Sequence, residues 1–440
     1  MNFNVSTPDW VKQAVFYQIF PDRFAKTQRP RHSLPAAMQV PLEDWEAPPQ
    51  FHSYKGGDLW GAMEQLDYLV DLGITALYFT PIFQSASNHR YHTHDYYNVD
   101  PLLGGNAAFD DFLQAAHDRQ LKVVLDGVFN HASRGFFHFN DILENGPNSA
   151  WIDWFQIEQF PLSAYDGDRP ANYKGWWDMR ALPVFNHDHP PVREYLMQVG
   201  EYWVGKGIDG WRLDVPGEVK TEGFWEEFRD RIKAINPEAY IVGEIWDDAT
   251  PWLKGDQFDG VMNYPFTSAT LAFVAGDRVA LPLVEGPGYY PYPSLDAIAY
   301  SEKITALLQQ YPWEIQLTQL NLLDSHDTAR ALSVVGEDRA SYELALLLLM
   351  TFPGAPSIFY GDEVGLAGGL DPDCRRGFPA PEQWDQAYLS LHKQLIALRR
   401  RHPALCLGRY QPLAAEGLAY AFARCWPGGL GGSWGRGGTA

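Results

Sequence analysis

The sequence has little cysteine: 440 residues contain Cys374, Cys406 and Cys425. No two of them form a CxxC pair, and three cysteines cannot all be joined in intramolecular disulfides. This excludes a disulfide-stapled secreted scaffold and a zinc or redox site built on CxxC pairs. A protein of a reducing compartment fits this cysteine usage.

Basic residues and long apolar runs are also scarce. Lys and Arg total 34 against 55 Asp and Glu, which gives a net charge of −21. Such a surface repels a phosphate backbone, so we expect no nucleic-acid partner. No stretch reaches the roughly 18 apolar residues of a membrane span, and the opening MNFNVSTPDWVKQ lacks the pattern of a signal peptide. We therefore expect a cytoplasmic protein without a membrane partner.

Aromatic residues are abundant, at 15% of the chain. Part of this excess serves the core, because aromatic rings bury large apolar areas. Flat rings also stack on the apolar C–H faces of sugars. Composition alone therefore makes carbohydrate one candidate ligand.

Short apolar runs alternate with segments of helical period, which predicts βα units and a parallel sheet. Eight runs read as strands: AVFYQIF from Ala14, ITALYFT from Ile74, LKVVLD from Leu121, IDGWRLDV from Ile208, AYIVGEI from Ala239, FDGVMNY from Phe258, LNLLD from Leu320 and PSIFYGD from Pro356. No Gly-rich nucleotide loop follows the first run. This pattern favours an α/β fold, a closed (β/α)8 TIM barrel.

The spacing of the runs suggests a domain division. Residues 1–130 and 187–402 are expected to form the barrel, and 131–186 an insertion subdomain after the third strand, rich in Trp, Asp, Asn and Pro. Residues 403–426 are expected to form a short, apparently truncated C-terminal β-region. The Gly-rich segment 427–440 is expected to be a disordered tail.

Polar residues stand where the predicted strands end. Asp214, Glu244 and Asp327 follow three different strands, and the alternation of a strand sends Arg212 to the same face as Asp214. In a barrel these strand ends meet at the catalytic rim. Two carboxylates suffice to cleave a glycosidic bond. The sequence has no Ser or Cys nucleophile elbow and no HExxH metal motif, which disfavours esterase and zinc-hydrolase chemistry.

The motifs DGVFNH (126–131), GIDGWRLDV (207–215), VGEIW (242–246) and LLDSHDT (322–328) resemble those of the α-amylase family, glycoside hydrolase family thirteen. The resemblance runs in family order from VFYQIFPDRF (15–24) to DPDCRR (371–376). It implies a retaining mechanism acting on α-glucans.

The resemblance also implies roles for single residues. Asp214 would be the nucleophile, Glu244 the general acid/base, and Asp327 the carboxylate that orients the sugar hydroxyls. Arg212 would support Asp214, while Asp126 and Asn130 would brace the rim. The residues expected to contact substrate are Tyr91, His131, Arg212, Trp246, His326, Asp371 and Arg375.

Within the family, SNHRYHTHDYYNVDP and GGLDPDCRRGFP look most like the cyclomaltodextrinase, neopullulanase and maltodextrin-glucosidase branch. That branch carries an N-terminal β-domain that helps to form a dimer. Here the barrel begins by residue 14, so monomer and homodimer both stay open. His92 replaces an Asp that serves exo-acting relatives. The stretch Ala25–Arg29 lacks the carboxylates of a calcium loop, so we expect no required cofactor and no metal ligands, and Ca²⁺ binding stays open.

The sequence therefore predicts a retaining hydrolase that cleaves α-1,4 bonds of short linear or cyclic maltodextrins by double displacement, and cleavage of α-1,6 bonds stays open. A glucanotransferase acting on the same substrates would use the same catalytic residues. A non-catalytic barrel of the family is the remote alternative. Linkage preference, exo or endo action and oligomeric state stay open, because loops around the site determine them.

Overall fold

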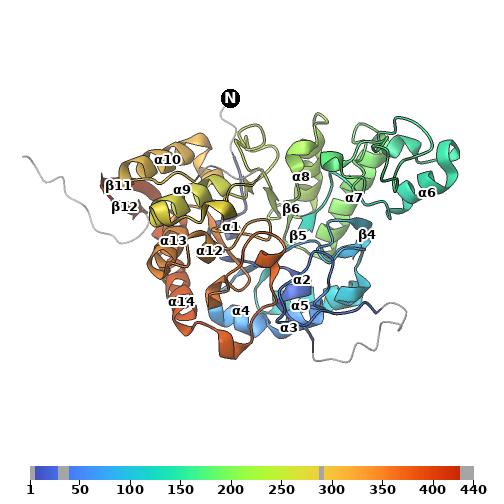
Figure 1. The fold of residues 1–440 in the computed structure, drawn as a ribbon. Coiled ribbons are helices and arrows are strands. Elements are labelled where there is room, and N and C mark those ends of the chain that lie inside the picture. The colour runs from blue at the N-terminus through green and yellow to red at the C-terminus, as the bar shows by residue number, and fades with distance from the viewer. Residues whose placement is uncertain (1–4, 28–38, 287–291, 427–440) are drawn as a thin grey trace, which may run out of the picture.

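A computed structural model describes residues 5–27, 39–286 and 292–426 (Figure 1). The Gly-rich tail expected at 427–440 lies outside the described residues. Among the described residues, none of the helices combines the length and the apolar character that crossing a membrane requires.

Eight parallel strands form the centre of the molecule. They are β1 (Phe16–Ile19), β2 (Ala76–Phe79), β5 (Lys122–Gly127), β6 (Gly210–Leu213), β7 (Tyr240–Gly243), β8 (Gly260–Val261), β9 (Leu320–Asn321) and β10 (Ala355–Phe359). The sheet order is β8-β7-β6-β5-β2-β1-β10-β9. A parallel bridge between Met262 and Leu320 joins its two ends. The predicted (β/α)8 barrel is thereby confirmed. Each strand overlaps the run predicted for it, although β5 ends one residue beyond its run, at Gly127, and β10 begins one residue before its run, at Ala355.

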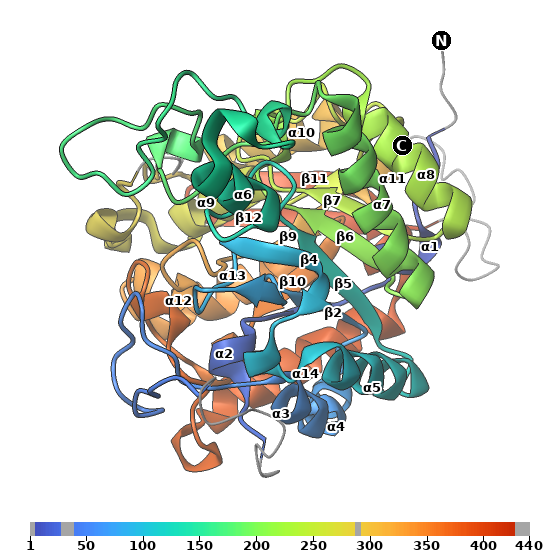
Figure 2. The same cartoon turned by 90° about the vertical axis from the view of Figure 1, so that its right-hand side faces the viewer.

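Helices surround this barrel (Figure 2). They are α1 (Asp9–Lys12), α2 (Pro21–Phe24), α3 (Leu59–Glu64), α4 (Leu66–Leu72), α5 (Gly105–Asp118), α7 (Pro190–Lys206), α8 (Phe224–Ile235), α9 (Tyr264–Ala275), α10 (Ala297–Gln310), α11 (Trp313–Gln316), α12 (Ala331–Val334), α13 (Arg339–Thr351) and α14 (Gln386–Arg401). The helical period around Phe109 corresponds to α5. Its buried residues, spaced three and four apart, face the sheet.

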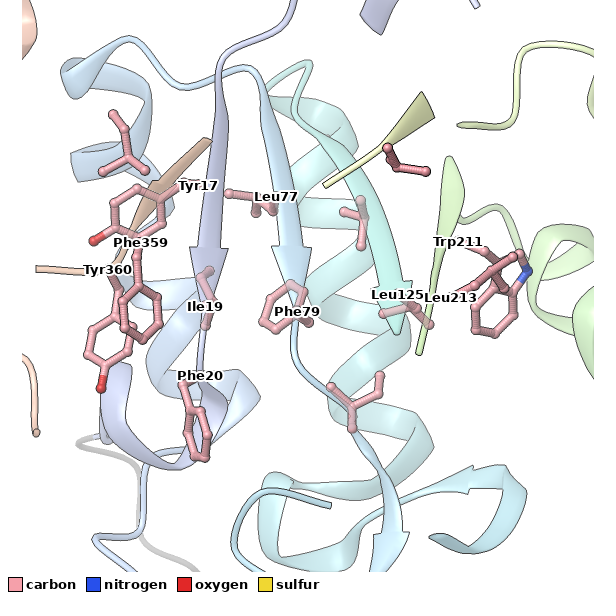
Figure 3. Close-up of a cluster of buried hydrophobic side chains, with 14 of the residues drawn as sticks. Tyr17, Ile19, Phe20, Leu77, Phe79, Leu125, Trp211, Leu213, Phe359 and Tyr360 are labelled. Carbon is pink, nitrogen blue, oxygen red and sulfur yellow. The ribbon is translucent and has the colours of Figure 1, made fainter. Parts of the chain in front are cut away.

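The alternation of the strands separates two cores. Tyr17, Leu77 and Trp211 point outward and pack under the helices, as Figure 3 shows. Phe16 and Tyr78 belong to a second cluster that fills the barrel. Because side chains alternate along a strand, the inward positions nearest the carboxyl ends are the ones available to a site on the rim.

A long segment joins β5 to α7. It contains α6 (Phe137–Asn145), three short 3-10 turns and isolated antiparallel bridges, among them His131 with Val184 and Phe155 with Phe185. Aromatic rings pack it together; for example, Phe155 stacks on Phe185 with ring centroids 5.4 Å apart. The limits 131–186 given to the insertion stay a prediction.

A second excursion carries Tyr91 and was not predicted as strand structure. It is the antiparallel pair β3 (Phe83–Ser85) and β4 (Thr93–Val99), which follows β2. The pairing register shifts between Phe83 and Ser85. Short strands with irregular register have no clear period of two, which explains why the sequence pattern did not reveal them.

The region 403–426 begins with a helix, α15 (Pro403–Leu407), which the sequence analysis did not predict. The antiparallel hairpin of β11 (Arg409–Glu416) and β12 (Ala419–Cys425) follows. In Figure 1 this hairpin lies at the opposite side of the molecule from α6. Arg424 ties it to the barrel layer by donating to the carbonyls of Thr351 and Leu405. The hairpin therefore lies far from the insertion.

Close packing between strands leads to the first prediction. A Cβ atom added at Gly210 would lie 2.3 Å from the carbonyl oxygen of Tyr240 on the neighbouring strand. Gly210→Ala should therefore destabilise the protein by about 1–3 kcal/mol. Thermal and denaturant unfolding of the purified variant would measure this loss.

Gly205, near the end of α7, supplies the matched control, because a Cβ atom there meets nothing within 4 Å. Gly205→Ala should leave stability unchanged or raise it by up to about 1 kcal/mol. Equal stability of the two variants would contradict the packing described for β6 and β7.

Candidate active site

Arg212 lies at the centre of the carboxyl-end rim. It is fully buried on β6, and its Nη1 donates to Asp126 Oδ2 at 3.0 Å and to Asp214 Oδ1 at 3.1 Å. Its Nη2 lies 3.1 Å from Glu244 Oε2 and 4.0 Å from Asp327 Oδ2. One guanidinium therefore brings together the three carboxylates predicted to be catalytic.

Asp126, at the end of β5, braces this arrangement. Its Oδ2 accepts hydrogen bonds from the hydroxyls of Tyr78 at 3.0 Å and Tyr91 at 2.9 Å, besides the bonds from Arg212. The register places Asp126 opposite Arg212 on adjacent strands. Asp126 is thus a fixed counter-charge that holds the guanidinium and the Tyr91 ring, in keeping with the bracing role expected for it.

Two N–H groups hold Glu244, just beyond β7. The backbone N–H of Val215 donates to Oε2 at 3.1 Å, and the indole N–H of Trp246 donates to Oε1 at 3.0 Å. The Trp246 ring stacks on Tyr264, with centroids 3.7 Å apart and planes 7° apart. The polar edge of Trp246 therefore positions a carboxylate, and the expected contact of Trp246 with a sugar stays a prediction.

Val215 has a left-handed backbone, with φ 35° and ψ 48°. This conformation is a genuine outlier for a β-branched residue, and such strain persists only where the surroundings impose it. It occurs directly after Asp214, and the Val215 N–H points at Glu244. The strained turn therefore links the two carboxylates.

His326, after β9, joins a chain of hydrogen bonds. Its Nδ1 lies 2.7 Å from the amide nitrogen of Gln18 on β1, and its Nε2 lies 2.5 Å from the Tyr91 hydroxyl and 3.1 Å from Asp327 Oδ2. Burial, followed by Arg375 and Arg212, holds the pKa of His326 well below its usual range. The ring is therefore neutral, and donation from Gln18 to Nδ1 leaves the proton on Nε2.

The loop after β10 adds the remaining pair. Arg375 donates from Nε to the carbonyl of His326 at 2.8 Å, and its Nη1 lies 3.0 Å from Asp371 Oδ1. Its Nη2 lies 3.5 Å from Asp327 Oδ1. Asp327 keeps 29% of its side chain exposed, so this carboxylate faces the open rim.

His131 lies at the start of the insertion and is buried. Its Nδ1 lies 3.2 Å from the amide nitrogen of Asn130, and its ring stacks on Trp176 with centroids 5.2 Å apart. Within the described part of the chain, its Nε2 has no hydrogen-bond partner. Burial lowers the pKa of His131 to about 3, so the ring is neutral at ordinary pH.

The electrostatics of the cluster oppose full ionisation. Burial raises the pKa of Asp214, of Glu244 and of Asp327, and the positive charge of Arg212 lowers all three. Burial also raises the pKa of Asp126 to about 6. Neighbouring carboxylates raise the pKa of Asp214 and of Glu244 further. Four carboxylates sharing one guanidinium thus favour retention of a proton on the cluster near neutral pH.

No group of three or more His, Cys, Asp or Glu side chains among the described residues is arranged to hold a metal ion. The expectation that no cofactor is required stays a prediction. Nine of the ten predicted site residues form one connected set of hydrogen bonds and ion pairs. The tenth, His131, is held beside the rim by Trp176 and Asn130.

The sequence analysis missed three members of the site. Gln18, Tyr78 and Val215 all contact a predicted residue. The alternation of β1 and β2 could have identified Gln18 and Tyr78, since both occupy inward positions near the strand ends. Nothing in a β-branched residue signals a left-handed turn, so Val215 could not have been found from the sequence.

Comparisons with known proteins agree with this geometry. Residues 18–378 match the family described as alpha amylase, catalytic domain. A debranching enzyme from Nostoc punctiforme, whose crystal structure was determined after soaking with acarbose, is 63% identical in sequence to this chain. The match covers 96% of this chain and 88% of the chain of that enzyme, with a TM-score of 0.89.

Two curated relatives are each 43% identical. A cyclomaltodextrinase of Geobacillus thermopakistaniensis matches 93% of this chain and 66% of its own length. Neopullulanase 2 of Thermoactinomyces vulgaris matches 95% of this chain and 68% of its own length. The chain therefore spans about two thirds of the length of these relatives.

The cluster leads to a prediction on stability. Arg212→Met leaves Asp126, Asp214 and Glu244 without their shared cation, and breaking a buried pair costs about 3–5 kcal/mol. The pKa values of these carboxyls, already raised in the folded state, should rise further. A group whose pKa is raised by folding loses its stabilising contribution as pH increases.

The Tm of Arg212→Met should therefore fall below that of the parent protein at pH 8 and recover part of the difference at pH 5. Differential scanning calorimetry across this range would measure it. Arg339→Met removes an exposed cation that pairs with Glu343, and serves as the control with little pH dependence. A pH-independent loss in Arg212→Met would show that the carboxylates do not depend on this charge.

Proposed function

Because the chain belongs to the α-amylase family of glycoside hydrolases, we propose that it is a retaining hydrolase of α-glucosidic bonds in short linear or cyclic maltodextrins. One observation carries the proposal: Asp214 and Glu244 both lie 3.1 Å from the guanidinium of Arg212 at the rim of the barrel. Retaining glycosidases need two carboxyl groups close together, one as nucleophile and the other as acid/base.

The roles follow from the contacts. Asp214 accepts a hydrogen bond from Arg212, which favours its ionised form, and it attacks the anomeric carbon. Glu244 lies beside Nη2 of Arg212 and protonates the leaving glycosidic oxygen. In the second half-reaction Glu244 takes a proton from water, which releases the sugar from Asp214.

Other residues hold the sugar. Asp327, partly exposed and fixed by His326 and Arg375, accepts hydrogen bonds from ring hydroxyls and stabilises the positive charge that develops at the anomeric carbon. His131 is the second group proposed to bind a hydroxyl of the same sugar, and its buried Nε2 has no hydrogen-bond partner among the described residues. Tyr91, anchored through its hydroxyl to Asp126, presents its ring to the pyranose.

Names of the relatives support the substrate class. A cyclomaltodextrinase and a neopullulanase are each 43% identical to the chain. Oligosaccharide is therefore the proposed partner, and a cytoplasmic location and independence of a metal cofactor belong to the same proposal. Hydrolysis of α-1,4 bonds is its leading form.

A second candidate is cleavage of α-1,6 branch points. The observation that favours it is the 63% identity to a structure named as a debranching enzyme, over 96% of this chain. The two candidates share the catalytic residues and differ in which bond the rim admits.

A product time course would separate these activities. We expect β-cyclodextrin to be opened and maltoheptaose to be shortened, with products resolved by chromatography. Release of maltotriose from pullulan, with the cyclodextrin left intact, would instead identify the α-1,6 activity. No change in any of the three substrates would contradict the proposal.

The contact between Trp246 and Glu244 predicts a pH effect. Trp246→Phe keeps the ring on Tyr264 but removes the N–H that stabilises the ionised carboxylate, so the pKa of Glu244 should rise by about one unit. Glu244 must be protonated to act as the acid. The basic limb of the kcat/KM profile should therefore move to higher pH by a similar amount.

Trp384 offers the control, because its indole N–H donates to the backbone carbonyl of Pro379. Trp384→Phe loses a hydrogen bond of the same kind and should leave the profile in place. A Trp246→Phe profile that stays fixed, or whose basic limb moves to lower pH, would refute this role for Trp246.

A further inference from the structure

An aromatic stack leads from the active site to the surface of the insertion. His131 stacks on Trp176, with centroids 5.2 Å and planes 17° apart, and Trp176 stacks on Trp177, with centroids 4.8 Å and planes 17° apart. His131 is buried and Trp176 is half-buried, whereas Trp177 is 68% exposed. The three nearly parallel rings thus end in an open indole.

The backbone of this stack is strained. Trp177 and Asp178 both have left-handed conformations, with φ of 50° and 59°. Two consecutive non-glycine residues in this region cost free energy, and such strain accumulates where a ligand site needs a particular side-chain position. The apolar Trp177 ring nevertheless lies in solvent, the opposite of what the hydrophobic effect favours.

Hydrogen bonds fix the turn that carries the stack. The Trp176 N–H donates to the Leu182 carbonyl at 2.9 Å, and the Met179 N–H donates to the Trp176 carbonyl at 2.9 Å. The Ala132 N–H, next to His131, donates to the Pro183 carbonyl at 3.0 Å. The turn is therefore tied to the rim of the barrel, so the indole has a set position relative to the cleavage site.

Two ring nitrogens within the stack are buried. In the residues that the structure describes, neither Nε1 of Trp176 nor Nε2 of His131 has a hydrogen-bond partner. Exposed Lys174 and Asp178 flank the Trp177 ring in the sequence. The exposed Trp177 indole, with charged residues close by in the chain, presents an apolar face of the kind that suits a pyranose, whose C–H face is apolar and whose hydroxyls lie around its edge.

We propose that Trp177 forms a remote sugar-binding platform, on which a glucose unit outside the cleavage site stacks. The inference rests on the proposed function, since the platform serves an α-glucan bound at the rim. It binds the outer part of longer chains, and it makes affinity depend on chain length.

Trp177→Asn tests the platform, because Asn tolerates the left-handed backbone while removing the ring. Trp177→Gly is a second variant that accepts the same conformation, so loss of the ring is separated from misfolding. Each is combined with Glu244→Gln, which slows turnover so that intact substrate can be titrated by calorimetry. Phe137→Ala, in the same background, removes another exposed ring of the insertion, 66% exposed on α6, and is the matched control.

The measured quantity is the ratio of two affinities of the same variant, that for maltoheptaose divided by that for maltotriose; this ratio is the gain in affinity with chain length. We expect this gain to fall by about fivefold in Trp177→Asn and Trp177→Gly, as the loss of one aromatic contact implies, and to stay unchanged in Phe137→Ala. An unchanged gain in the Trp177 variants would overturn the platform. Equal weakening of both sugars would also overturn it, because the stack would then act only by supporting His131.

Failure of the proposed function would look different. If Glu244→Gln retained full turnover, or if the parent protein bound neither sugar, the hydrolase assignment itself would fail. If the parent protein binds both sugars and binds maltoheptaose more tightly, the hydrolase assignment stands. The affinities of the Trp177 variants then test the platform alone.

Discussion

The site depends on one buried guanidinium. Arg212 has no exposed surface and lies within hydrogen-bonding or ion-pair distance of Asp126, Asp214, Glu244 and Asp327. Burying a cation costs several kcal/mol unless carboxylates compensate it, and burying carboxylates carries the same requirement. The guanidinium and the carboxylates therefore offset the free-energy cost of burying one another inside the barrel. Burial raises the pKa of each of these carboxyls, and one cation cannot offset that effect for four of them.

The rest of the fold serves this cluster by position. Barrel strands aim alternate side chains inward, and only the positions at their carboxyl ends are free of the apolar plug formed by residues such as Phe16 and Tyr240. The excursion after β2 brings Tyr91 to Asp126, and the insertion after β5 carries the aromatic stack. In the proposed mechanism, loops thus supply the sugar contacts, while positions at or just beyond the strand ends supply the reacting groups.

Much of the barrel and of the candidate site was predictable from the sequence, because the residues of a strand alternate between its two faces. The alternation in Trp211-Arg212-Leu213-Asp214 placed Arg212 and Asp214 on one face, and the strand ends identified Glu244 and Asp327. The hydrogen bond of Gln18 to His326 spans 308 positions, and no local pattern encodes such a pair. The strained backbones at Val215 and Trp177 were also beyond sequence reasoning, because tertiary contacts impose them against local preference. Helix α15 was missed because it has five residues, and the whole of 403–426 was predicted as a β-region.

The central claim is that Asp214 forms a covalent bond to the sugar. A 5-fluoro-α-glucosyl fluoride reacts with a retaining α-glucosidase but slows release of the glycosyl-enzyme, so the adduct accumulates. Peptide mass spectrometry after brief exposure should find one fluoroglucosyl group on the peptide that contains Asp214, and none in Asp214→Asn. An adduct on another residue, or inactivation without any adduct, would contradict the account.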